Sequence, residues 1–257
     1  MRAEILSHLT QIEARYDVKV VYACESGSRA WGFASANSDY DVRFIYIHPF
    51  DWYLSVDEKR DVIESPIHNS LDVNGWDLRK AFRLLKKANP SILEWLHSPI
   101  VYIEQPFVVT KLRQLAQDYF SSPVCLYHYL HMAKGNFRDY LQGNSVWLKK
   151  YLYVLRPLLV MRWIEQYHCM PPTNFGLVVD RLDLPHDLRQ AIDQLLDRKR
   201  AGDELRQELR IPILSEFIES ELVRWETTRI PRQTIRNNTD HLNQTFIKIL
   251  YEARGQG

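Results

Sequence analysis

Apolar positions in the first part of the chain change from helical to strand-like spacing. Ile5, Leu9 and Ile12 recur every three or four residues, which predicts an amphipathic helix over residues 3–15. Short apolar runs bounded by polar or turn-forming residues then predict strands. The expected strands are residues 18–25, 40–48, 60–64 and 67–73.

Helical spacing dominates the rest of the chain. It predicts a helix over residues 78–88, after which Asn89 and Pro90 supply the N-cap and the first-turn proline of another. Later helices are expected at residues 122–141, 145–167, 186–209, 213–228 and 240–253. The pattern therefore predicts an α+β protein, with a small mixed-sheet domain at residues 1–120 and a helical domain at residues 121–257.

Two polar motifs flank the connection between the first two predicted strands. Gly27-Ser28 follows one strand, and after ten intervening residues Asp39 and Asp41 stand at the start of the next. Because side chains alternate along a strand, the two aspartates are expected on one face. Neighbouring carboxylates repel unless a positive charge lies between them, and hard oxygen ligands favour Mg²⁺ or Mn²⁺. A Gly-Ser turn can offer backbone N–H groups to a phosphate, so the motifs together predict nucleotide transfer.

This arrangement resembles the nucleotidyltransferase superfamily typified by DNA polymerase β, whose signature is Gly-Ser or Gly-Gly, then Asp-x-Asp or Asp-x-Glu, then a third carboxylate on a later strand. The stretches at residues 25–32 and 38–43 are similar to a bacterial and phage family of predicted nucleotidyltransferases, some associated with RNA repair. This closer resemblance extends from about residue 20 to about residue 165. It implies a polymerase-β-like catalytic domain followed by a helical domain, and transfer of a nucleoside monophosphate from an NTP with release of pyrophosphate.

Two aspartates compete for the third carboxylate of this signature. Asp77 begins the helix predicted at residues 78–88, where it would act as a cap without a catalytic role. Asp72 lies at the end of a predicted strand, at about the interval before the helix that the related families show. Asp72 is therefore the expected third ligand, and Asp77 remains the alternative.

The parts of the motif imply a division of roles. The catalytic and metal-binding set consists of carboxylates, namely Asp39, Asp41 and Asp72, with Mg²⁺ or Mn²⁺ as the cofactor. Asp72 would help to bind a second metal ion or act as base on the acceptor hydroxyl. The residues expected to contact the nucleotide's phosphates are Gly27, Ser28 and Arg29. Arg43, on the Asp41 face, is either a phosphate ligand or an ion-pair partner.

The helical part contains a basic and aromatic segment. Residues 121–165 carry six Lys or Arg and two acidic residues, a net charge of +4 against +1 for the whole chain, with eight aromatic residues interleaved. This composition suits phosphates and stacked bases; alternatively, the rings are core and the charges a solvated face. Lys149, Tyr153 and Arg156 share one helical face and are expected to bind the nucleotide, since related two-domain nucleotidyltransferases place a Lys or Arg of this half on the triphosphate.

Composition bounds the location of the protein. Cys24, Cys125 and Cys169 are far apart and form no Cys-x-x-Cys pair, which argues against a zinc site or a disulfide framework and fits a reducing compartment. The N-terminus is charged and amphipathic rather than a signal peptide, and the chain has no 18-residue apolar run. The sequence therefore predicts a cytoplasmic protein without membrane contact.

Several functions are compatible with these motifs. The favoured one is a metal-dependent nucleotidyltransferase that acts on an acceptor hydroxyl of RNA. The alternatives are a transferase that adenylylates a partner protein or modifies a small molecule, and a nucleotide-binding regulatory module without turnover. Stacking tolerates any base, so no particular NTP is singled out, and the oligomeric state is left open.

Overall fold

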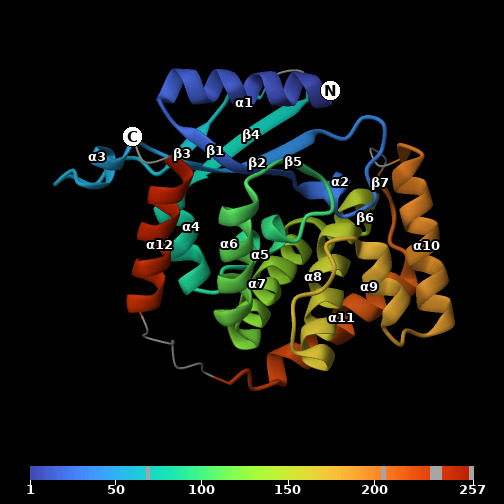
Figure 1. The fold of residues 1–257 in the computed structure, drawn as a ribbon. Helices are drawn as coiled ribbons and strands as arrows, with labels where there is room; N and C mark the ends of the chain where they lie inside the picture. The colour runs from blue at the N-terminus through green and yellow to red at the C-terminus, as the bar shows by residue number, and fades with distance from the viewer. Residues whose placement is uncertain (68–69, 204–206, 232–238, 255–257) are drawn as a thin grey trace. The chain divides into compact units, whose positions relative to one another are not determined.

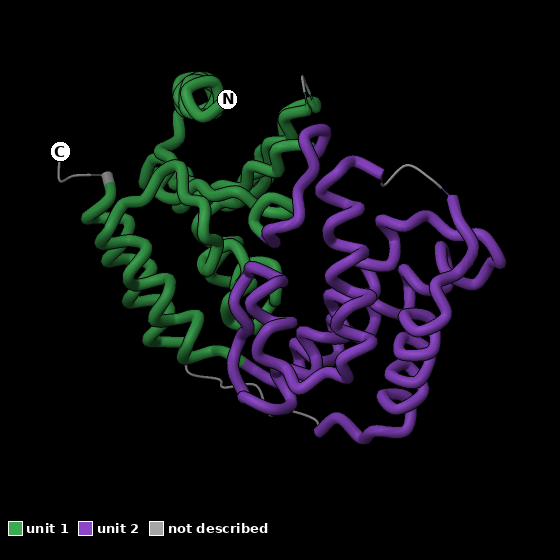
Figure 2. Tube along the Cα trace, turned by 90° about the vertical axis from the view of Figure 1, so that its right-hand side faces the viewer, with its two compact units in different colours: residues 1–30, 39–120, 235–257 green, residues 31–38, 121–234 purple. Residues whose placement is uncertain are grey.

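The computed structural model shows two compact units (Figure 1, Figure 2). The structure describes residues 1–67, 70–203, 207–231 and 239–254. Unit 1 comprises residues 1–30, 39–120 and 235–257, and unit 2 comprises residues 31–38 and 121–234. The expected α+β class is confirmed, because unit 1 contains a mixed sheet and unit 2 is mainly helical. The expected domain ranges differ from these units at residues 31–38 and 235–257.

Unit 1 is built on a five-stranded sheet with the order β3-β4-β2-β1-β5. Its strands are β1 (Lys19–Glu25), β2 (Tyr40–Ile47), β3 (Val62–Glu64), β4 (Leu71–Asp77) and β5 (Val101–Glu104). Its helices are α1 (Arg2–Tyr16), α2 (Gly27–Ala30), α3 (Phe50–Tyr53), α4 (Leu78–Lys86), α5 (Pro90–Leu96), α6 (Pro106–Asp118) and α12 (Thr239–Arg254). β2 and β4 run parallel, whereas the other neighbouring pairs are antiparallel.

Helices cover both faces of this sheet (Figure 1). The buried side of α1 carries Ile5, Leu9 and Ile12, which join one apolar core with Val42 and Phe44 of β2. The helices α4, α5 and α6 lie on the opposite face (Figure 1). This two-sided cover explains why β1 is almost continuously apolar instead of alternating.

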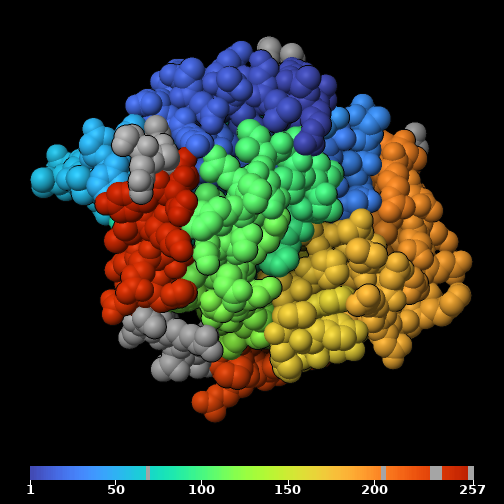
Figure 3. Space-filling view, in the orientation of Figure 1, coloured from blue at the N-terminus to red at the C-terminus, as the bar shows by residue number. Residues whose placement is uncertain are grey.

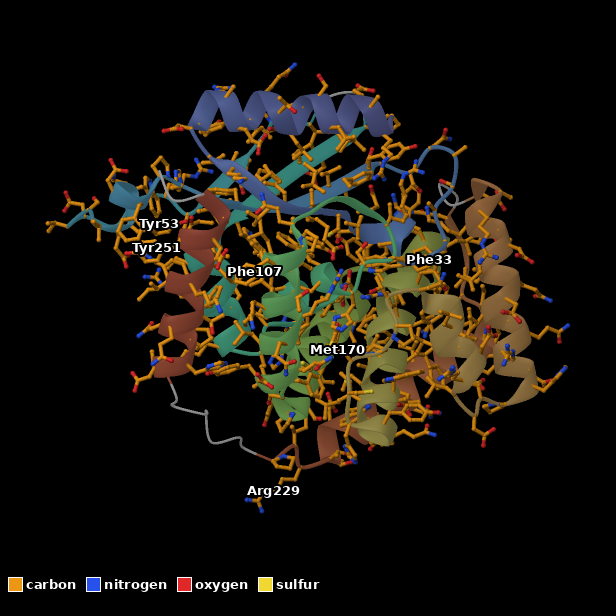
Figure 4. All side chains as sticks on the ribbon, in the orientation of Figure 1. Phe33, Tyr53, Phe107, Met170, Arg229 and Tyr251 are labelled. Atoms are coloured by element: carbon orange, nitrogen blue, oxygen red, sulfur yellow. The ribbon has the colours of Figure 1, made fainter. Side chains whose placement is uncertain are left out.

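The last helix, α12, belongs to unit 1, although the sequence pattern placed it in a helical C-terminal domain. The Phe246 ring lies 5.4 Å from the ring of Tyr53 and 5.3 Å from that of Phe82, centre to centre. Figure 3 shows α12 (red) against α6 (green), and Figure 4 labels Tyr53 and Tyr251 at the same end of the unit. Amphipathic spacing reveals that a helix buries one face, but not which elements cover it.

Unit 2 consists of helices and a small two-stranded sheet. Its elements are α7 (Ser122–Tyr140), β6 (Ser145–Trp147), α8 (Leu148–Tyr167), α9 (Phe175–Arg181), α10 (His186–Arg200), β7 (Gln207–Leu209) and α11 (Pro212–Thr227). β6 and β7 occupy ends of the helices expected at 145–167 and 186–209, and this expectation was wrong there because three-residue strands are too short to show a period. In the described part of the chain, no helix is long and apolar enough to cross a membrane.

Residues 31–38 are part of unit 2, although they connect β1 to β2 of unit 1 by way of α2. The ring of Phe33, labelled in Figure 4, meets Phe175 edge-on with centroids 5.9 Å apart. The backbone N–H of Phe175 donates to the carbonyl of Trp31 at 2.9 Å. The sequence predicted only a short connector here, since its aromatic residues give no sign of their partners in residues 121–234.

The strand expected at residues 67–73 begins later and continues to Asp77. Residues 68–69 of that expectation lie outside the described part of the chain. Gly75 discourages a strand prediction, but it is the register partner of Phe44, and a Cβ at Gly75 would lie 2.2 Å from the Phe44 ring. The Phe44 ring therefore fills the space that a side chain at Gly75 would occupy, which allows β4 to continue through this glycine.

Asp77 ends β4 and caps α4. Its carboxylate accepts the backbone N–H of Arg79 at 2.7 Å and the hydroxyl of Tyr53 at 2.6 Å. The residue is 0% exposed. Burial raises the pKa of its carboxyl to about 6, although both hydrogen bonds favour the charged form.

We expect Asp77 to make the free energy of unfolding fall as the pH rises from about 4 to about 6. In this window the folded state keeps the proton that the unfolded state has lost, so deprotonation disfavours folding. The loss amounts to at most about 3 kcal/mol. Urea unfolding measures the free energy of unfolding of the wild type and of Asp77→Asn across this pH range. The difference between the two proteins isolates Asp77, because the other carboxyls contribute equally to both.

The Asp77→Asn variant keeps an oxygen that can cap α4, whereas Asp77→Ala should lose a further 0.5–2 kcal/mol or so at every pH. The raised pKa of Asp77 would be contradicted if the free energy of unfolding of the wild type, relative to that of Asp77→Asn, stayed constant or increased between pH 4 and pH 6.

Candidate active site

The parallel pairing of β2 with β4 brings two of the predicted aspartates together. Asp41 and Asp72 are direct register partners on these neighbouring strands, so their side chains emerge from the sheet on the same face. Arg43, two residues after Asp41, shares that face. Three polar residues from two strands thus meet at one place in unit 1.

The guanidinium of Arg43 bridges the two carboxylates. Its Nη2 lies 3.2 Å from Oδ1 of Asp41 and 2.8 Å from Oδ2 of Asp72. Its Nη1 donates to the carbonyls of Val42 and Asp72 at 3.0 and 3.1 Å. Of the two roles considered for Arg43, the structure therefore shows the ion-pair partner.

Burial raises the pKa of the Asp41 carboxyl above its usual range. The guanidinium of Arg43 opposes this shift, and the negative charges of Asp72 and Asp39 add to it. Two facing carboxylates that already share one cation provide the hard oxygen donors that Mg²⁺ or Mn²⁺ prefers. Asp41 and Asp72 therefore fit a divalent metal ion in their chemistry.

Asp39 and Arg29 lie at the edge of this group. Asp39 precedes β2 and is exposed, so it does not share the strand as the alternation argument expected. The Nε of Arg29 donates to the Asp39 carbonyl at 3.1 Å, and its guanidinium stacks 3.6 Å from the centre of the Tyr40 ring. In the part of the chain that the structure describes, no three His, Cys, Asp or Glu side chains are gathered closely enough to hold a metal ion by themselves.

Gly27 packs directly against Asp41. Its φ is +60°, a left-handed conformation, and a Cβ added here would lie 2.0 Å from Oδ2 of Asp41. The next contact comes from Ser26, whose backbone N–H donates to the Asp41 carbonyl at 2.8 Å. Gly27 and Ser28 begin the short helix α2, so both predicted motifs meet at Asp41.

Glu25 is a residue of the site to which the sequence assigned no role. It ends β1, is 0% exposed, and its Oε1 accepts the backbone N–H of Asp41 at 2.7 Å. Its Oε2 accepts the hydroxyl of Tyr102. Burial raises the pKa of this carboxyl. An acidic residue at the end of an apolar strand was the available signal, since such residues are depleted in strands.

The remaining predicted residues belong to unit 2, on α8. Arg156 is 4% exposed, and its guanidinium lies 4.2 Å from the centre of the Trp31 ring. Tyr153 meets Trp31 edge-on, with 6.2 Å between centroids. The shared face expected for Lys149, Tyr153 and Arg156 is therefore partly buried, because α8 is surrounded by apolar contacts along most of its length.

Replacing Gly27 with Ala should destabilise the protein by about 1–2 kcal/mol from the left-handed conformation alone, and more from the clash with Asp41. Equilibrium unfolding in urea measures the change. The control is Gly135→Ala in α7, where an added Cβ meets nothing within 4 Å, so a gain of about 0.5–1 kcal/mol is expected. Equal effects at the two glycines would contradict the close packing at Gly27.

Known proteins resemble this chain along its whole length. The model of the RNA repair pathway DNA polymerase beta family (RlaP) matches residues 1–248. The uncharacterized protein YcgL of Bacillus subtilis (strain 168) is 46% identical over 258 residues, which cover 100% of this chain and 99% of that protein. The crystal structure of a nucleotidyltransferase-like protein from Exiguobacterium sibiricum 255-15 aligns with 95% of this chain and 77% of its own, at 16% identity and a TM-score of 0.31. By its match over nearly all residues, this chain belongs to the RNA repair pathway DNA polymerase beta family.

Proposed function

We propose that the protein transfers a nucleoside monophosphate from an NTP to a hydroxyl group, with RNA as the acceptor that we favour. In this reaction the acceptor oxygen bonds to the α-phosphorus, the bond from that phosphorus to the β-phosphate's bridging oxygen breaks, and pyrophosphate leaves. The observation that carries the proposal is the pairing of Asp41 with Asp72 beside the Gly27 turn. Family membership supports both the reaction class and the RNA acceptor.

Asp41 and Asp72 would hold the divalent metal ion, Mg²⁺ or Mn²⁺, with the exposed Asp39 as a further ligand. When bound, the metal neutralises charge on the transferring phosphoryl group and on the leaving pyrophosphate. The side chain of Asp72 is 32% exposed, so its carboxylate is accessible to the acceptor hydroxyl and is the proposed base for its proton. Ser28 and the Gly27 backbone are the proposed contacts for the phosphates.

Arg43 would have two successive roles in this proposal. Without a metal ion its guanidinium neutralises Asp41 and Asp72. With Asp41 and Asp72 holding the metal ion, Arg43 would lose its carboxylate partners, and its guanidinium donors would become available to the nucleotide's phosphates. The ion-pair and phosphate roles thus apply to different states of the site.

Asp72→Asn should lower the rate of nucleotide transfer by about 10²–10⁴-fold, the range typical of losing an acid–base group, and Asp41→Asn should also lower it because a ligand of the metal ion is lost. The assay incubates the protein with each α-³²P-labelled NTP, Mg²⁺ or Mn²⁺, and separate pools of RNA and cell protein. The matched control is Asp51→Asn, an exposed aspartate elsewhere in unit 1, which should retain wild-type turnover. Label in the protein pool alone would contradict the proposal that RNA is the acceptor. Absence of label from every pool would contradict the proposal that the protein transfers a nucleotide.

Arg43→Gln should tighten Mn²⁺ binding in the absence of nucleotide by about tenfold or more, since a cation within hydrogen-bonding distance of both carboxylates competes with the metal. Titration calorimetry or the electron paramagnetic resonance of free Mn²⁺ at pH 8 measures the affinity. Arg29→Gln removes the same charge, but Arg29 acts on the Asp41 carboxyl less strongly than Arg43 does, so a smaller effect is expected. Weaker Mn²⁺ binding in Arg43→Gln would show that Arg43 prearranges the carboxylates instead of competing.

A further inference from the structure

The basic residues of the segment 121–165 differ in their surroundings. Three of them pair with carboxylates inside unit 2: Lys134 with Glu226, Arg138 with Asp139 and Arg162 with Glu221. In contrast, no carboxylate of the described residues pairs with Lys149 or Lys150. The positive charge available to a ligand is therefore concentrated at the start of α8.

The aromatic residues of the same segment also separate into two groups. Tyr129 and Tyr151 are completely buried and form part of the core, as the alternative interpretation of this segment expected. Tyr140 and Tyr153 are 40% and 38% exposed. These two rings, unlike the exposed Tyr127, lie beside Lys150, so an exposed aromatic surface and an available positive charge coincide there.

These residues form a continuous contact series, which we call the cation–aromatic ladder. It consists of Tyr140, Lys150, Tyr153, Trp31 and Arg156. The Nζ of Lys150 lies 3.5 Å from the centre of the Tyr140 ring and 5.3 Å from that of Tyr153. Tyr153 meets Trp31 edge-on, and Arg156 stacks on Trp31. All five residues belong to unit 2.

The two ends of the ladder have different properties. Arg156 is buried, so it positions Trp31 and does not contact a ligand. Trp31 is also fixed by its carbonyl, which accepts the N–H of Phe175. At the other end, Tyr140 and Tyr153 are exposed, and both rings lie near Lys150. The buried end therefore gives the exposed end a rigid support.

We propose that the exposed end of the ladder binds single-stranded RNA. An unpaired base would stack on Tyr140 or Tyr153, and the neighbouring phosphates would contact Lys149 and Lys150. The inference deepens the proposed function and rests on its RNA acceptor. It assigns Tyr153 to the RNA strand in place of the NTP. Bases within a duplex already stack on one another, so the exposed rings favour an unpaired strand.

The first test compares two labelled strands of equal charge with the full-length protein at low ionic strength. One is decauridylate, and the other is a ten-unit abasic phosphodiester. Fluorescence anisotropy should give at least about tenfold tighter binding of decauridylate, the gain typical of stacking on aromatic side chains. Equal affinity for the two strands, or no binding of either, would overturn the proposal.

The second test removes the rings. Tyr140→Leu combined with Tyr153→Leu should weaken decauridylate binding at least about tenfold and leave the abasic strand unaffected. Tyr127→Leu is the matched control, because Tyr127 is 44% exposed on the same helix but lies beside His131 in place of a lysine. Tyr153→Phe keeps the ring and should keep binding, which provides a test even if the leucine pair does not fold. Loss of binding in Tyr127→Leu, or unchanged binding in the leucine pair, would overturn the assignment.

The third test removes the charge. The double variant Lys149→Gln, Lys150→Gln should make the slope of log K against log salt concentration shallower by about 1.4. This value corresponds to roughly 0.7 for each of two lost phosphate contacts. Lys134→Gln is the control, since Lys134 is already paired with Glu226, and should leave the slope unchanged. Failure here is distinct from failure of the proposed function. If the protein releases pyrophosphate but does not bind decauridylate, only this inference is contradicted. If it binds decauridylate but releases no pyrophosphate, only the proposed transfer reaction is contradicted.

Discussion

The parallel pairing of β2 with β4 is the constraint on which the site depends. Its register makes Asp41 and Asp72 direct neighbours, which in water would be an unfavourable juxtaposition of like charges. The guanidinium of Arg43 relieves this repulsion from the same face of the sheet. A shift of one residue in this register would send Asp72 to the opposite face, so the chemistry of the site is fixed by backbone hydrogen bonds.

Two further contacts hold Asp41 in position. Glu25 accepts its backbone N–H from the end of β1, and Gly27 leaves room for its carboxylate. Neither contact needs to take part in the reaction. Together they place the Gly-Ser turn and the Asp-x-Asp strand within hydrogen-bonding distance of one another, which is what a phosphate site beside a carboxylate pair requires.

Sequence reasoning recovered the parts of the fold that local spacing determines. Buried residues of α1 and the apolar runs of β1 and β2 were visible because their periods are long enough to recognise. Asp72 could be separated from Asp77 because a residue that starts a helix has a reason to be acidic. Glu25 was missed because its role depends on Asp41 and Tyr102, which are distant in sequence. Arg156 was expected to bind the nucleotide, and its burial was not foreseen because helical spacing does not reveal which side of a helix is buried.

The interleaving of the two units has a consequence for how the protein is made. Unit 2 needs residues 31–38, which are synthesised before most of unit 1, and unit 1 needs α12, which is synthesised after all of unit 2. No contiguous fragment shorter than residues 1–257 holds all of unit 1, and any fragment that holds all of unit 2 also includes residues 39–120. On the ribosome, the surface of α4 and α6 that α12 contacts therefore stays uncovered until all of unit 2 has been synthesised. Exchange of one intact unit between proteins during evolution is correspondingly restricted. Because each unit is discontinuous in sequence, no single deletion removes one unit and leaves the other complete.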